Sequence, residues 1–183
     1  MRLPFERKTV VPAAVASALP LAKGEKVLAG APDVDTGVWL VATTHTLALV
    51  RLDHEGAEPA TPAGAQAVWR RPWHEVDRGS WDGESSLLTV TWADRGRPGQ
   101  WRLGQEALFL QSLRERVQAS VVLAQELPLS GRRTGRAVIR QDLATGDLLE
   151  QVVLGRGVQT DPEVEAVSTA ALAWLREQVG MPS

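Results

Sequence analysis

The stretch GVWLVATTHTLALV, residues 37–50, decides the fold because two runs of alternating apolar positions lie within it. In residues 38–42 the even positions share one face, and in residues 47–50 the odd positions do. Side chains of a strand point alternately to its two faces, so a period of two indicates strands. Thr43 to Thr46 is short enough for a tight connection. We therefore predict an antiparallel pair of strands here.

The same pattern extends outward from Lys26 to Leu103, interrupted by turn residues at intervals of roughly 8 to 12 positions. It predicts seven short strands in an antiparallel meander. Residues 53–65 are rich in proline and glycine and have no periodicity, which predicts a mobile loop. After Gly104 the period becomes 3.6, and we expect an amphipathic helix over residues 105–123. Its buried stripe consists of Phe109, Leu113, Val117 and Val121.

The last 60 or so residues predict a smaller unit of a hairpin and a helix. Residues 136–141 and 148–154 alternate, and DLATGD between them suits a tight turn with a left-handed glycine. Thr160 or Asp161 caps a final helix that has Pro162 at its first position and ends at Gly180. Its buried stripe includes Trp174 or Leu175. The chain thus divides into an N-terminal segment (1–23), a β-rich domain with its helix (24–123) and a ββα tail (124–183).

The N-terminal segment has two readings. Basic residues precede an apolar stretch, and Ala16-Ser17-Ala18 has the form of a signal-peptidase site, so residues 1–20 could be a removed signal. A short packing helix that opens at Pro12 explains the same residues. We expect the helix and a cytoplasmic protein, and leave the removal of the segment open.

Seven strands followed by one helix resemble the pleckstrin-homology (PH) superfold, and residues 24–122 are similar to bacterial PH-like and GRAM-like domains. The stretch Gly37–Val50 carries the resemblance best, with a threonine-rich corner between strands two and three. The resemblance implies an α+β fold in which a seven-stranded antiparallel barrel is closed by a helix. It also implies a binding module of an uncharacterised actinobacterial type.

Composition excludes several kinds of chemistry. The chain has no cysteine, which excludes disulfides and thiolate sites, and its three histidines make a histidine-rich metal site improbable. We expect no cofactor. The net charge of −2 gives no overall attraction to nucleic acid, and no apolar run reaches the roughly 20 residues that span a bilayer. Asp33 and Asp35 occupy the loop in which lipid-reading PH domains carry cations, so we expect no membrane binding.

Three motifs resemble catalytic or phosphate sites, and each has a simpler explanation. Gly155-Arg156-Gly157 lacks the third glycine and the lysine of a phosphate loop, which favours a tight turn. Asp53, His54 and Glu55 lie in the predicted loop without rigid support. Ser80 with His74 and Asp77 has the residue types of a triad but no nucleophile elbow. We expect no enzyme.

Two sets of residues are candidates for contact with a partner. The first is the positive stretch in the tail, in which Arg136 and Arg140 share one strand face; its members are Arg132, Arg133, Arg136 and Arg140. A solvated strand face is the simpler interpretation. The second is the pair Trp69 and Trp73, which flank Arg70, Arg71 and Pro72 and which we expect to be the most exposed tryptophans; core packing accounts for most of the others.

These observations favour a non-enzymatic binding or protein-interaction module. Its partner would be a protein or a second copy of the chain that uses the 136–154 hairpin. Pairing at the outer edges of the hairpin would give a symmetric dimer, and charge pairing through the four arginines would give a salt-sensitive complex. Two alternatives stay open: a peripheral module that binds anionic lipid, and an enzyme whose site is assembled from dispersed residues.

Overall fold

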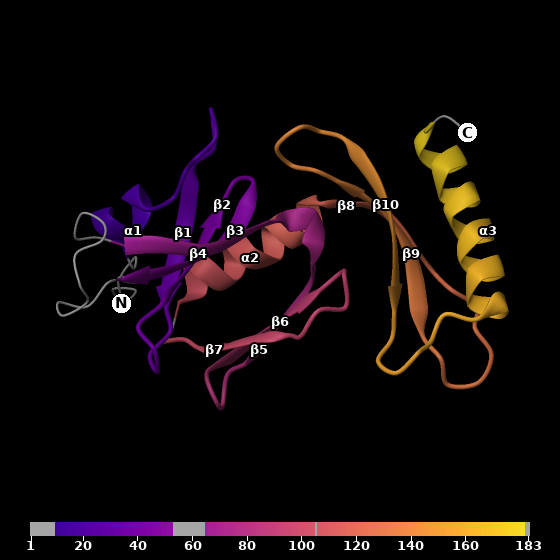
Figure 1. Ribbon diagram of the computed structural model, residues 1–183, viewed down its shortest axis with the longest axis horizontal. Coiled ribbons are helices and arrows are strands. Elements are labelled where there is room, and N and C mark those ends of the chain that lie inside the picture. Colours follow the sequence, from indigo (N-terminus) through magenta and orange to yellow (C-terminus); the bar gives the residue numbers. More distant parts are fainter. Residues whose placement is uncertain (1–9, 53–64, 105, 182–183) are drawn as a thin grey trace, which may run out of the picture.

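The computed structural model describes residues 10–52, 65–104 and 106–181 and shows an α+β protein with three separate antiparallel sheets (Figure 1). The first sheet has the order β1-β2-β3-β4, the second β5-β6-β7 and the third β10-β9-β8. The elements are α1 (Ala13–Ser17), β1 (Val27–Pro32), β2 (Trp39–Thr43), β3 (Thr46–Leu52), β4 (Ala65–Pro72), η1 (Trp73–Glu75), β5 (Val76–Asp82), β6 (Leu87–Trp92), β7 (Gly99–Arg102), α2 (Ala107–Ala119), β8 (Val121–Glu126), β9 (Gly135–Gln141), β10 (Leu148–Leu154) and α3 (Pro162–Val179).

The β2–β3 hairpin confirms the alternation in residues 37–50. Leu40 pairs with Leu49 and Ala42 with Leu47, and Leu40, Ala42 and Leu47 join the core beneath α2. Val41 and the other opposite-face residues pack instead against α1 and the segment after it. Both faces of this hairpin are therefore covered, which explains why it is apolar on both.

A buried ion pair fixes the segment after α1 to the first sheet. The Arg70 guanidinium lies 2.6 Å from the Glu25 carboxylate, and the Thr43 hydroxyl donates to Glu25 Oε1 at 2.5 Å. Burial alone would raise the pKa of Glu25, but the hydrogen bonds from Arg70, Thr43 and the Ala22 amide outweigh it and lower the pKa to about 2.

The predicted closed barrel is wrong. Seven strands do precede α2, but β1–β4 and β5–β7 form separate sheets. The contacts between these sheets include an isolated bridge between Asp33 and Leu103 and a hydrogen bond of 2.9 Å from the Val34 amide to the Arg102 carbonyl. The 3₁₀ helix η1 turns the chain between β4 and β5, and its Trp73 is fully buried beneath α2. Alternation identifies the inward side of each strand but not which strands exchange backbone hydrogen bonds. The predicted loop over residues 53–65 lies outside the described residues, except for Ala65 at the start of β4.

The predicted helix over residues 105–123 is too long. The helix α2 ends at Ala119, where the Ser120 hydroxyl donates to the Val117 carbonyl, and the chain continues as β8. The β-branched Val121 and Val122 favour this change to a strand. The tail is therefore a three-stranded sheet with a helix, and the predicted boundary between residues 123 and 124 falls inside β8.

The final helix α3 confirms its predicted caps. The Asp161 side chain accepts a hydrogen bond from the Val164 amide at 2.9 Å, and Gly180 adopts φ +70° at the other end. Leu175 is fully buried against the third sheet, whereas Trp174 is 47% exposed. The stripe thus includes Leu175 and leaves Trp174 largely outside.

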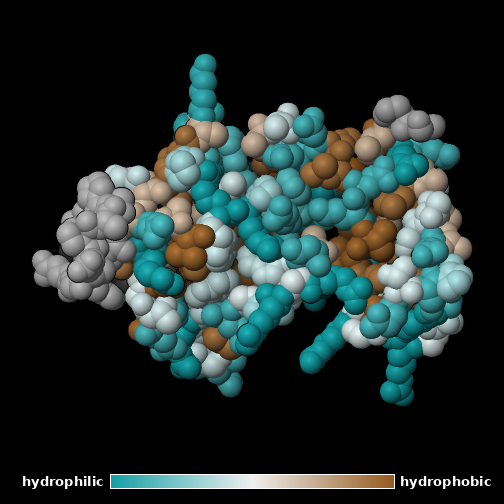
Figure 2. Space-filling model, in the orientation of Figure 1, coloured by the Kyte–Doolittle hydropathy of each residue, from teal (hydrophilic) through white to brown (hydrophobic). Residues whose placement is uncertain are grey.

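The third sheet lies between α3 and the rest of the protein. Ala137 and Ile139 of β9 pack towards α3, and the alternate residues Arg136 and Arg140 face the other way. In Figure 1 the third sheet and α3 form a distinct part beside the first two sheets, and Figure 2 shows a mostly hydrophilic face that is hollowed between the two parts. The parts are joined by polar contacts, among them a hydrogen bond of 2.9 Å from the Gln151 amide to the His74 carbonyl.

Candidate functional site

The four arginines of the predicted contact do not form one exposed surface. Arg140 is fully buried, with its Nη1 donating to Ser120 Oγ at 2.8 Å. Arg136 shares its strand face, as the sequence predicts, but that face is turned inward and Arg136 pairs with Asp77. Arg133 pairs with Asp161 and Glu163 at the start of α3. The alternation of side chains along a strand establishes that Arg136 and Arg140 share a face, but it does not show whether that face is exposed to solvent.

The remaining arginine, Arg132, is exposed. Across the part of the chain that the structure describes, it forms no ion pair. A partner contact of this tail through Arg132 stays a prediction.

The tryptophan prediction is wrong for Trp73. Its side chain is fully buried, and its indole nitrogen donates to the Thr43 carbonyl at 3.0 Å. Trp69 is half-buried and packs edge-on against Trp92, with ring centroids 5.6 Å apart. The polar and proline neighbours of Trp73 suggested that it is exposed, but η1 turns its side chain into the core. Trp81, at 36% exposed, and Trp174 are the more exposed indoles.

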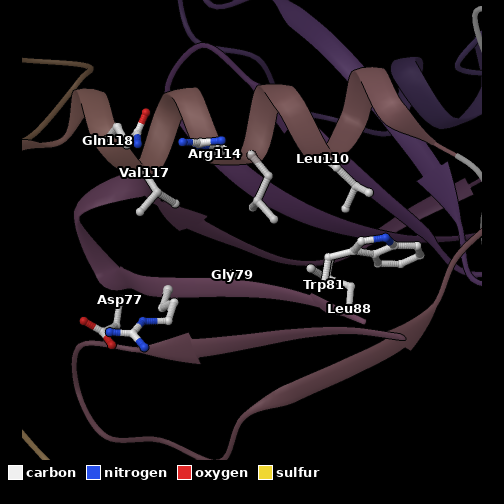
Figure 3. A pocket seen from close by; sticks show the side chains of 10 residues that line it. Asp77, Gly79, Trp81, Leu88, Leu110, Arg114, Val117 and Gln118 are labelled. Carbon is white, nitrogen blue, oxygen red and sulfur yellow. The ribbon is translucent and has the colours of Figure 1, made fainter. Parts of the chain in front are cut away.

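An apolar groove of about 410 Å³ runs between α2 and β5 (Figure 3). Leu110, Leu113 and Val117 come from α2, and Trp81 and Leu88 come from the strands. Figure 3 shows Leu110 and Val117 pointing from the helix towards the strands, with Trp81 below Leu110. The volume of the groove lies in the range of sites that bind small ligands.

A glycine allows the helix to approach the strand so closely. A Cβ atom at Gly79 would lie 2.8 Å from Leu113 Cδ2, nearer than ordinary carbon contacts. The backbone of β5 is consequently part of the groove wall.

The outer edge of β5 is open. β5 pairs with β6 on one side, and among the described residues no backbone hydrogen bond joins its residues 77–82 to a further strand. Residues Arg78 to Asp82 are exposed. An edge strand of this kind carries unpaired N–H and C=O groups that can accept another strand.

The rim of the groove is positive. Arg78 and Arg114 line it and are exposed, whereas the only lining carboxylate among the described residues, Asp77, is turned to Arg136. The uncompensated charge at the groove is therefore cationic.

This groove was not predicted from the sequence, although some signals were present. In the predicted helix, Arg114 and Gln118 fall outside the stripe of buried residues, and both line the groove. The exposed second half of β5, GSWD, breaks the apolar alternation of the neighbouring strands. The packing of α2 beside β5 is a tertiary feature, and neither the period of two in the strands nor the period of 3.6 in the helix indicates it.

The candidate catalytic residues are not brought together as a triad. Asp77 pairs with Arg136, and His74 Nδ1 lies 3.8 Å from an oxygen of Asp142 instead. Over the described ranges, no cluster of three or more histidine and carboxylate side chains could hold a metal ion. No helix in those ranges is both long and apolar enough to cross a membrane. Asp53, His54 and Glu55 lie outside the described residues.

Comparison with known proteins gives no relative: no family model, no curated protein and no solved structure matches the chain. The resemblance to PH-like and GRAM-like domains therefore stays a prediction.

Proposed function

We propose that the protein is a non-enzymatic interaction module that binds an extended segment of a partner protein along β5. The observation that carries the proposal is the open edge of β5 beside an apolar groove whose far wall is α2. A bound segment would pair its backbone with β5, and its alternate side chains would enter the groove. The seven residues of β5 match a segment of roughly 20 Å.

The charge of the rim favours an acidic segment. Arg78 and Arg114 flank the apolar floor without a described ion-pair partner, so acidic residues that alternate with apolar ones would meet complementary charge. Such rim contacts contribute more to specificity and association rate than to total affinity. The partner is thus expected to present acidic and apolar residues in alternation.

Selection from a displayed library of random nine-residue segments, with the full chain as target, tests the proposal. We expect the enriched segments to alternate apolar and acidic residues. The affinity of a synthetic enriched peptide is then measured by fluorescence anisotropy. Arg114→Glu should weaken binding about tenfold, since reversal of one rim charge changes the free energy of binding by about 1.4 kcal/mol. Val117→Glu, which places a charge in the groove, should weaken it further.

Arg132→Glu is the matched control, because Arg132 is also exposed but lies in the tail and does not line the groove. It should leave the affinity unchanged. Thermal melts of all three variants exclude loss of folding. Equal weakening by Arg132→Glu and Arg114→Glu would contradict the proposal, and so would enrichment of segments with no acidic residues. A second copy of the chain as the occupant would appear as a dimer in light scattering that the peptide dissociates.

A further inference from the structure

A second cleft, of about 860 Å³, lies between the second and third sheets, on the other side of Asp77 and Arg78 from the groove. Its walls come from β5, β6 and the turn after β6 on one side, and from β9 and the Gly155–Gly157 turn on the other. The cleft thus joins segments that lie far apart in the sequence.

The cleft concentrates positive charge in a chain whose net charge is −2. Four arginines line it, against the two carboxylates Asp77 and Glu126; they are Arg78, Arg95, Arg136 and Arg156. Arg156 is exposed and forms no ion pair with any described residue. Opposed walls with this excess attract anions more strongly than scattered surface charges do.

The excess of positive charge is larger when the buried Arg140, behind the wall of the cleft, is included. Asp77 is the acidic partner of two arginines. Arg136 pairs with its carboxylate, and Arg140 Nη2 lies 3.8 Å from Asp77 Oδ1. Arg140 is fully buried, and its Nε and Nη2 have no hydrogen-bond partner among the residues that the structure describes. Burial lowers the pKa of its guanidinium, as expected for a cation that its surroundings do not fully compensate. A further negative charge in the cleft would therefore relieve an imbalance.

The Gly155–Gly157 turn adds backbone donors. The Gly155 amide donates to the Thr134 carbonyl at 2.7 Å and the Val158 amide to the Gly155 carbonyl at 3.1 Å, but the amides of Arg156 and Gly157 donate to no described residue. Arg95 fixes this turn by donating to the Val158 carbonyl at 2.9 Å. Free amides in a turn with a left-handed glycine, Gly157 at φ +77°, form the kind of concavity that holds anions.

We propose that this cleft binds a small soluble anion that carries two or more phosphate groups. The guanidinium groups of Arg95, Arg136 and Arg156 would bind the phosphate oxygens, for which their fork of donors is well suited. The free amides of the turn would bind the terminal phosphate. The site is separate from the peptide groove, except that Asp77 and Arg78 line both.

Calorimetric titration of the full chain with inorganic tripolyphosphate tests this site. We expect one molecule to bind, with a Kd below about 1 mM. Arg156→Gln should weaken binding about tenfold, the value of one charge-assisted contact, while Arg132→Gln leaves it unchanged. In amide NMR spectra, the signals of Arg156 and Gly157 should shift on binding. Arg114→Glu, which disturbs the peptide groove, should leave the tripolyphosphate affinity intact, so failure of one site is distinguishable from failure of the other.

Three results of the titrations would overturn the assignment. They are absence of binding at several times the expected Kd, equal loss in Arg156→Gln and Arg132→Gln, and tighter binding of citrate than of tripolyphosphate. The second would mean diffuse attraction and the third a carboxylate site. Sedimentation with phosphatidylglycerol vesicles that Arg156→Gln abolishes would assign the phosphate contact to a lipid headgroup and overturn the soluble ligand.

Discussion

Replacement of Asp77 by asparagine removes the carboxylate that Arg136 and Arg140 share and should strongly destabilise the protein. The distance of 3.8 Å between Asp77 and Arg140 corresponds to an attraction of roughly 4 kcal/mol at an effective dielectric constant of about 20. Asp77 and Arg136 are mostly buried and Arg140 is wholly so. Loss of the carboxylate leaves a buried cation without compensation, so we expect the free energy of unfolding to fall by about 3 kcal/mol.

Urea denaturation followed by tryptophan fluorescence measures this change. Asp35→Asn is the control, because Asp35 pairs with Arg102 at 3.2 Å in a largely exposed position and should contribute less than about 1 kcal/mol. The double variant Asp77→Asn with Arg140→Met should recover part of the loss, since it removes the uncompensated cation. Two results would refute the reasoning. The first is an Asp77→Asn variant with an unchanged free energy of unfolding. The second is a double variant whose loss of free energy equals the sum of the losses in the two single variants.

Three further predictions concern stability and membranes. Because the pKa of Glu25 is lowered to about 2, its ion pair stabilises the protein fully above pH 4.5 and loses this effect as the pH falls towards 2. Glu25→Gln should therefore lower the free energy of unfolding by about 3 kcal/mol at pH 7 and by little at pH 2, as measured by urea denaturation at each pH. Trp73→Ala should cost about 4 kcal/mol through the cavity that it leaves, whereas Trp174→Ala should cost less than about 1 kcal/mol; thermal melts with the opposite order would contradict the burial of the two side chains. Vesicles of anionic lipid should not sediment the protein at physiological salt, because Asp33 and Asp35 lie in the β1–β2 loop, and tight, salt-sensitive sedimentation would refute this.

Local features of the fold could be predicted from the sequence because local physics determines them. The alternation in residues 37–50 gave the faces of β2 and β3, and Asp161, Pro162 and Gly180 gave the ends of α3. Sheet membership could not be predicted, because the break at η1 depends on how Trp73 packs beneath α2. The strand β8 was hidden for a related reason, since Val117 and Val121 continue the helical spacing across a change of structure.

The candidate site was less predictable than the fold. Arg136 and Arg140 stood out as a cluster, but the buried position of Asp77 turned them inward and made them structural supports of a cleft. The hairpin that was expected to offer two free edges has one of them paired, because β9 lies between β10 and β8. The groove arises from a strand and a helix that are some 30 positions apart, and its open edge is a property of the assembled sheet.

The central claim is that β5 accepts a further strand, and hydrogen exchange of its backbone amides tests this most directly. In the free protein, the outward amides of residues 77–82 should exchange rapidly, and a selected acidic and apolar peptide should slow their exchange. Amides of β10, an edge strand in the third sheet, serve as the internal control and should not change. Slower exchange confined to β5 and the groove face of α2 is the predicted result. Unchanged exchange in β5 with the peptide bound, or equal slowing in β5 and β10, would contradict the account.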